Sequence, residues 1–146
     1  YKSRRVAGLF GVYRRSGFCH KFLRREGDKK VASNKIIVKF LSRPFGTIHY
    51  VEGLRAALGI ASGWDEHEVF LLFMGEGAYY VLNGVGRTDS LKYINTLEKL
   101  GFGLYVERES LTDLGIDEND VSKEFTIISR QDAFEKMKEY DFTIDF

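Results

Sequence analysis

Five apolar runs of strand length divide residues 35–146. In chain order they are KIIVKFL (35–41), EVFLLFM (68–74), FGLYV (102–106), EFTIIS (124–129) and DFTIDF (141–146). The second run is apolar at nearly every position, which is typical of a parallel strand covered on both faces. Each run therefore predicts one β-strand, and the segments between the runs hold the connections.

Two connecting segments carry an apolar stripe at helical spacing. Thr47 is the expected capping residue of a helix over residues 48–62, and Gly101 is the expected stop of a helix over residues 90–101. The inner face of the first helix comprises Val51, Leu54, Leu58 and Ala61. The inner face of the second comprises Leu91, Ile94, Leu97 and Leu100. Both helices are predicted to cover a sheet.

Shorter helical signals follow the remaining strands. Ser129 and Asp132 resemble a capping box that opens a helix over residues 130–140. A short helix is expected over residues 78–86, and another ends at Gly115 after the third strand. Strands that alternate with helices predict the α/β class, here a single-domain, mainly parallel five-stranded sheet flanked by helices in a doubly wound layout.

The charge pattern separates an N-terminal extension from this domain. Residues 1–35 carry a net charge of +9 and the remainder carries −8, although the whole chain is only +1. Residues 1–34 also contain scattered glycines and no steady helical period. We therefore predict a basic N-terminal extension over residues 1–34 and an α/β domain over residues 35–146.

Three interpretations of the basic extension remain open. It could be flexible, or it could dock on the acidic remainder of its own domain or of a neighbouring subunit through complementary charge. Alternatively, its arginines alternate with aromatic residues, a pattern that single-stranded RNA sites use to neutralise phosphates and stack bases. Those aromatic residues are Phe10, Tyr13, Phe18 and Phe22.

The composition points to a cytoplasmic protein. Cys19 is the single cysteine, so no internal disulfide framework can form. The apolar patch from residue 6 to residue 13 is short and interrupted by glycine, which argues against a secretory signal. No apolar run is long enough for a membrane span, so we expect no membrane association.

Three strand ends are candidate sites, because open α/β sheets bind ligands at the carboxyl ends of their strands. In SRPFGT (42–47), Arg43, Phe45 and Gly46 either help to hold an anion at a helix N-terminus or form a plain turn. The second end is GEG, which comprises Gly75, Glu76 and Gly77, and the third runs from Glu107 to Ser110 and includes Arg108. Glu76 and Glu107 are either a carboxylate pair for acid–base chemistry or two solvated surface acids.

The usual cofactor motifs are missing from the sequence. Gly75 and Gly77 begin a dinucleotide fingerprint, but Tyr80 stands where its third glycine belongs. His20, His49 and His67 are too dispersed to suggest a metal site. We therefore expect neither a nucleotide cofactor nor a metal.

In their order and spacing, residues 35–146 resemble the DsrE/DsrF-like sulfur-relay family, most closely its TusC/DsrF branch. The similarity rests on RPFGT followed by EGLRAALGIAS, on EVFLLFMGEGAYYVL, on LYVERESLTDLGI and on the closing YDFTIDF. It implies a parallel α/β subunit in trimers or hexamers, with itself or with related DsrE-, DsrF- or DsrH-like chains. In such assemblies a cysteine on one subunit type carries persulfide sulfur, toward tRNA 2-thiolation or sulfur metabolism, so any link to tRNA is indirect.

Two positions depart from the family pattern. The cysteine position lies eight residues before Gly115 and is Glu107 here, and the Asp-Gly pair is Glu76-Gly77. A carboxylate cannot form a persulfide, and Cys19 in the extension does not align with the family cysteine. Its basic neighbours could still lower the pKa of the Cys19 thiol, so Cys19 is either a substitute carrier or an incidental cysteine.

The leading hypothesis is a non-catalytic partner subunit of a sulfur-relay assembly, with no catalytic residue of its own. A homo-oligomeric small-ligand binder is the alternative, with a crevice near Arg43, Glu76, Glu107 and Arg108. RNA binding through the basic extension is the third hypothesis.

Overall fold

A computed structural model describes residues 33–63 and 67–146. Its core is a five-stranded sheet of β1 (Lys35–Phe40), β2 (Glu68–Phe73), β3 (Leu104–Glu107), β4 (Phe125–Ile128) and β5 (Phe142–Asp145). The strands lie in the order β4-β3-β2-β1-β5, and every neighbouring pair is parallel. The predicted α/β class and five-stranded parallel sheet are therefore confirmed. Apart from residues 33 and 34, the predicted extension lies outside the described residues.

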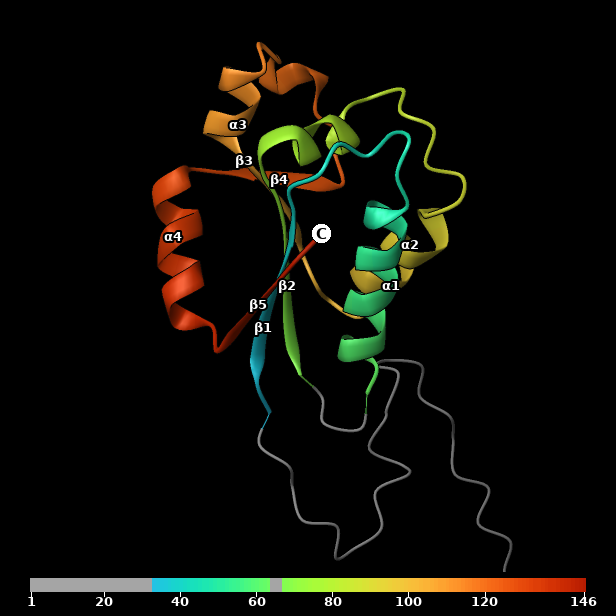
Figure 1. The fold of residues 1–146 in the computed structure, drawn as a ribbon, viewed down its shortest axis with the longest axis vertical. Coiled ribbons are helices and arrows are strands. Elements are labelled where there is room, and N and C mark those ends of the chain that lie inside the picture. The colour runs from blue at the N-terminus through green and yellow to red at the C-terminus, as the bar shows by residue number, and fades with distance from the viewer. Residues whose placement is uncertain (1–32, 64–66) are drawn as a thin grey trace, which may run out of the picture. The chain divides into compact units, whose positions relative to one another are not determined.

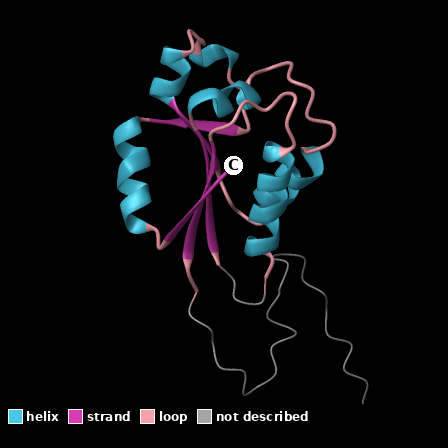
Figure 2. Ribbon diagram, in the orientation of Figure 1, coloured by secondary structure: helices cyan, strands magenta, loops and turns pink. Residues whose placement is uncertain are grey.

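Helices cover both faces of the sheet (Figure 1). Helices α1 (His49–Ala61) and α2 (Leu91–Lys99) lie against one face, and α4 (Arg130–Glu139) lies against the other. The short helices η2 (Gly75–Val81), α3 (Arg108–Asp113) and η3 (Glu118–Asp120) gather beyond the carboxyl ends of the strands, at the top of Figure 2. Loops after β1, β2 and β3 thus meet at one edge of the molecule.

The two faces of the sheet bury cores of unequal size. On the α1 and α2 face, Leu54, Ala57, Ile94 and Leu97 pack with the large cluster of strand residues. On the α4 face, a small cluster comprises Ile37, Phe70, Leu72 and Ala133. Strand β2 contributes to both clusters, which accounts for its nearly unbroken apolar sequence.

Several local predictions are confirmed. Gly101 and Gly115 both have positive φ just after their helices, at +86° and +69°, the usual way for a helix to end. The hydroxyl of Ser129 accepts a hydrogen bond from the Asp132 N–H at 3.1 Å, as a helix cap should. These signals are local in sequence, so they could be recognised without the fold.

Other local predictions are wrong. Thr47 does not cap α1, because its hydroxyl donates to the Arg43 carbonyl and the helix begins after Ile48. Leu91 is exposed rather than on the inner face of α2. The helix expected over residues 78–86 is the 3₁₀ helix Gly75–Val81, which begins directly at the end of β2. Among the described residues, no helix has both the length and the apolar character to cross a membrane.

Candidate functional site

Glu107 is the central residue of the carboxyl edge. It is the last residue of β3 and is only 1% exposed. The Arg130 guanidinium donates to both carboxylate oxygens, with Nε 2.8 Å from Oε1 and a terminal nitrogen 3.3 Å from Oε2. The Ser110 hydroxyl donates to Oε2 as well. Glu107 is therefore a buried carboxylate in a two-pronged ion pair, not the solvated strand-end acid that one interpretation of the sequence proposed.

The ion pair fixes the charge state of Glu107. Burial alone would raise the pKa of this carboxyl group, but the hydrogen bonds from Arg130 and Ser110, together with the charge of Arg130, outweigh burial and hold the pKa below its ordinary value. The same pair raises the pKa of Arg130. At neutral pH Glu107 is a carboxylate with its oxygens already in use, which suits it poorly to proton transfer.

Around this pair, hydrogen bonds join four elements. The Gly75 N–H at the start of η2 donates to the Ser110 hydroxyl of α3 at 2.8 Å. Glu109 accepts a hydrogen bond from the Arg130 backbone N–H at 2.7 Å, and Asp113 lies 3.4 Å from the guanidinium. The first residue of α4 is thus fastened to β3 and α3 through both its backbone and its side chain.

The other charged residues of the predicted crevice belong to separate exposed pairs. Arg43 contacts Glu76 at 2.6 Å, and Arg108 contacts Glu118 at 2.7 Å. Glu76 and Glu107 therefore have different cations as partners and are not the carboxylate pair that the acid–base interpretation required. The Arg43–Glu76 contact connects the loop after β1 to η2, which in turn contacts α3 through Gly75.

The glycines of the GEG segment have structural roles. Gly75 has a positive φ of +52°. A Cβ on Gly77 would lie 2.1 Å from the Phe40 carbonyl oxygen, so η2 can pack on the end of β1 only with glycine there. Gly46 has a φ of +81°, as the interpretation of SRPFGT as a turn predicts.

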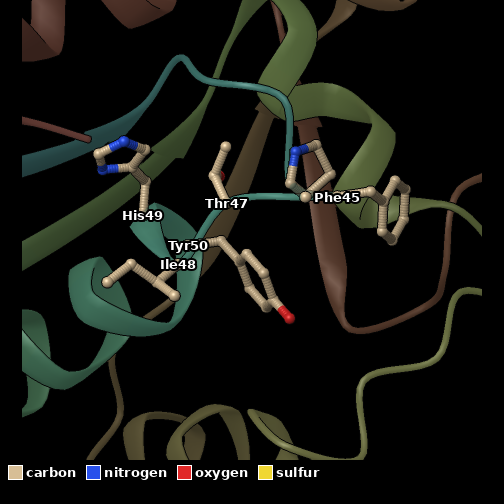
Figure 3. A pocket seen from close by; sticks show the side chains of 7 residues that line it. Phe45, Thr47, Ile48, His49 and Tyr50 are labelled. Carbon is tan, nitrogen blue, oxygen red and sulfur yellow. The ribbon is translucent and has the colours of Figure 1, made fainter.

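The loop after β1 borders an open hollow of about 540 Å³. Its lining runs from Pro44 to Tyr50, so it comprises the loop and the first residues of α1. In Figure 3, Phe45 and His49 extend to opposite sides of the hollow, and Tyr50 lies between them. Phe45 is 54% exposed and Ile48 is 70% exposed. The hollow is therefore a largely apolar surface beside the Arg43–Glu76 pair.

Two contacts of Glu107 were not predicted from the sequence. Arg130 lies two residues after the end of β4, so it also stands at the carboxyl end of a strand, beyond the three strand ends that the sequence singled out. Ser110 belongs to the third predicted strand end, but serine is too common for its spacing from Glu107 to indicate a hydrogen bond between them. Within the part of the chain that the structure describes, no group of three or more metal-ligating side chains gathers.

A family model, the DsrE/DsrF-like family, matches residues 34–146, which is most of the chain. The chain belongs to the DsrE/DsrF-like family. Membership of this family, predicted from the order of motifs, is therefore confirmed, and it connects the chain to sulfur relay and to a family that generally works in complexes. No curated protein sequence matches the chain significantly.

Solved structures share this fold at low sequence identity. The YchN protein from E. coli is 14% identical, with a TM-score of 0.65 over 78% of this chain and 99% of its own. The protein of unknown function MTH1491 from Methanobacterium thermoautotrophicum is 8% identical, with a TM-score of 0.63 over 78% of this chain and 100% of its own. At these identities the two structures support the DsrE/DsrF-like fold alone.

Proposed function

We propose that this chain is a non-catalytic partner subunit of a sulfur-relay assembly, in which a related, cysteine-bearing subunit carries the persulfide. The observation that carries this proposal is the environment of Glu107. Its carboxylate has no sulfur atom to form a persulfide, and Arg130 and Ser110 occupy its oxygens. Counted back from Gly115, this position corresponds to the family cysteine.

The surface that would meet the partner is the loop after β1. Phe45 and Ile48 expose more than half of their surface, and Leu41 just before them is also exposed. Exposed apolar side chains that gather beside a polar rim are typical of protein interfaces, and aromatic residues are enriched in interface cores. The Arg43–Glu76 pair supplies such a rim. We assign this surface to a cysteine-bearing DsrE/DsrF-like subunit.

The place of the subunit in the relay follows from the order of its motifs. The succession of RPFGT, EVFLLFMGEGAYYVL and LYVERESLTDLGI favours the TusC/DsrF branch. A TusC/DsrF-like subunit would belong to an assembly that delivers sulfur toward tRNA 2-thiolation or sulfur metabolism. Its own role would be to complete the interface and to shape the surface around the neighbour's thiol.

The native mass of the assembly tests this proposal. The full chain is measured alone and after mixing with a cysteine-bearing DsrE-like protein of the same organism. We expect a mixed oligomer that contains both chains. A homo-oligomer whose mass does not change on mixing would contradict the proposal and favour the independent ligand-binding alternative, which a thermal-shift screen over small metabolites would then examine.

Matched substitutions locate the interface in the same experiment. Phe45→Glu places a charge on the proposed surface, whereas Phe134→Glu places the same charge on α4, where the phenylalanine is similarly exposed. We expect Phe45→Glu to prevent formation of the mixed oligomer and Phe134→Glu to leave it intact. Equal effects of the two substitutions would remove the loop after β1 as the interface.

Sulfur transfer tests the absence of a carrier directly. The chain is incubated with a persulfide donor and its labelled sulfur is located by mass spectrometry. We expect no persulfide on the wild-type chain and none on a Cys19→Ser control. Stable sulfur on Cys19 that the control lacks would show that the extension carries a substitute thiol, which would overturn the non-catalytic role.

RNA binding by the extension is tested separately, because residues 1–34 can be removed. If these residues bind tRNA, their deletion abolishes a salt-sensitive retention of tRNA. If retention is unchanged, or does not depend on salt, the RNA interpretation fails while the partner-subunit proposal stands.

A further inference from the structure

The turn after η2 combines an asparagine and a glycine in a conformation suited to a spontaneous modification. Asn83 and Gly84 are both exposed, and Gly84 has a φ of +78° with open space where a side chain would be. Within the described part of the chain, the Gly84 N–H has no hydrogen-bond acceptor. Neither a side chain nor a hydrogen bond therefore shields this backbone nitrogen.

The side chain of Asn83 is held only weakly against reaction. Its amide nitrogen donates to the carbonyl oxygens of Asn119 and Val121, both at 3.4 Å, which is longer than a typical N–H···O bond. A bond between the side-chain carbonyl carbon of Asn83 and the Gly84 nitrogen would close a five-membered ring. The chain thus places a free nucleophile beside an amide that has only long hydrogen bonds.

We infer that Asn83 is a deamidation site. The Gly84 nitrogen attacks the side-chain carbonyl carbon of Asn83 and forms a new C–N bond. The bond from that carbon to the amide nitrogen then breaks, and ammonia leaves with the proton that Gly84 gives up. Water opens the cyclic imide at either carbonyl and yields aspartate or isoaspartate. No oxidation or reduction takes place, and water is the only other reactant.

The modification acts on the connection between this turn and η3. The backbone N–H of Asn83 donates a hydrogen bond to the carbonyl of Asp120, the last residue of η3, at 2.7 Å. The neighbouring residues Leu82 and Val121 form an antiparallel β-bridge. A carboxylate at residue 83 cannot donate to the Asn119 and Val121 carbonyl oxygens. It also adds a negative charge beside a segment that already contains three acidic residues, Asp117, Glu118 and Asp120. Isoaspartate also lengthens the backbone within the turn. Both products weaken the attachment of η3.

Two other asparagines of the same chain provide internal controls. Asn119 is followed by Asp120, and its side-chain amide donates to Asp117 at 2.7 Å. Asn95 lies within α2, where its backbone is helical and the next residue is the β-branched Thr96. Both therefore resist cyclisation for reasons that the structure shows, although both experience the same solvent and temperature as Asn83.

The test is incubation of the full folded chain in mildly alkaline buffer, followed by peptide mapping for the mass gain of an amide converted to an acid. We expect severalfold more conversion at Asn83 than at Asn119 or Asn95, and none at residue 83 in an Asn83→Gln variant, whose longer side chain disfavours the ring. Conversion at Asn83 no faster than at the other two would overturn the inference.

An Asn83→Asp variant tests the structural consequence without incubation. We expect faster hydrogen exchange of the backbone amides in residues 117–122 than in the wild-type chain, while the amides of β1 and β2 keep their protection. Unchanged exchange over residues 117–122 would show that Asn83 does not hold η3, and that part of the inference would fail.

Discussion

The ends of β1 and β3 lie at the same edge of the sheet but are built in opposite ways. At the end of β3, Glu107 is buried and its carboxylate is saturated by Arg130 and Ser110. At the end of β1, Phe45 and Ile48 expose most of their apolar surface beside an open hollow. The position that sequence analysis associated with chemistry is thus closed, and the position that it interpreted as a turn or an anion site presents an apolar surface.

This difference bears on the proposed partner-subunit role. A buried carboxylate with an arginine partner costs desolvation, and a buried ion pair is by itself weak evidence for stability. Here, however, the pair fastens α4 and α3 to β3 and so maintains the shape of the edge. The apolar loop after β1 needs no such chemistry to bind a neighbour. Under the proposed partner-subunit role, a chain with Glu107 at the cysteine position would therefore still be able to shape an assembly.

The largest effect is expected where the two strand ends are joined, at Gly77 in η2. A Cβ there would lie 2.1 Å from a backbone carbonyl oxygen, which cannot move aside as a flexible side chain could. We expect Gly77→Ala to lower the free energy of unfolding by about 3 kcal/mol. Urea denaturation followed by circular dichroism measures the change.

A matched glycine controls for the alanine itself. Gly59 lies within α1, where a Cβ meets no atom within 4 Å. We expect Gly59→Ala to raise the free energy of unfolding by up to about 1 kcal/mol, because alanine is the better helix former. If both substitutions changed the free energy of unfolding in the same direction, the close contact between η2 and β1 would not be the reason for glycine at position 77.

The second prediction breaks the ion pair at the closed end. Glu107→Ala leaves Arg130 without its main partner, and we expect a loss of about 1–3 kcal/mol, moderated because Arg130 is 44% exposed and water can solvate it. Glu107→Gln should cost less because it preserves the shape and can still accept hydrogen bonds. Thermal and urea unfolding of both variants measure the effect.

A double-mutant cycle separates the ion pair from the rest of the site. If Glu107 and Arg130 act as a pair, the loss in the Glu107→Gln, Arg130→Met double variant is smaller than the sum of the two single losses. Additive losses would mean that Glu107 stabilises the edge mainly through Ser110. In that case the stability of the β3 end would depend on the hydrogen bond from Ser110 rather than on the ion pair with Arg130.

The sequence predicted the strands well because their signals are local. The apolar run of residues 35–41 became β1 over Lys35–Phe40, and the glycine stops at Gly101 and Gly115 lie where expected. These features depend on neighbouring residues alone. Membership of the DsrE/DsrF-like family was likewise evident in the order of such local motifs.

The candidate site was predicted less well because its contacts are distant in sequence. Glu107 and Arg130 are 23 positions apart, and nothing local indicates that the β3–β4 pairing brings the end of β3 to the start of α4. Thr47 failed as a cap for a different, local reason: its hydroxyl donates to the carbonyl of Arg43, four residues earlier. The sequence supplied the candidate charges, and tertiary structure selected their partners.

The third prediction concerns how the stability contributed by Glu107, at the closed β3 end, depends on pH. Because the folded state lowers the pKa of Glu107, the unfolded chain binds more protons as the pH falls, and stability from this group is present above the unfolded pKa of about 4.3. That contribution is lost as the pH falls through the lower, folded pKa. We expect a steeper acid loss of stability in the wild-type chain than in Glu107→Gln, measured as urea midpoints from neutral to acidic pH. Parallel pH profiles would contradict the prediction.

The smallest effect on folding is expected at the open end. Because Phe45 and Ile48 already expose most of their side chains, Phe45→Ser and Ile48→Ser should change the free energy of unfolding by no more than about 0.5 kcal/mol. Urea denaturation at low protein concentration measures this in the dissociated chain. A loss of several times that value would mean that the two side chains support the fold of the loop itself. If the variants are as stable as the wild-type chain but no longer form the mixed oligomer, Phe45 and Ile48 serve the interface. The contrast between a closed, structural β3 end and an open, binding β1 end would then rest on two independent measurements.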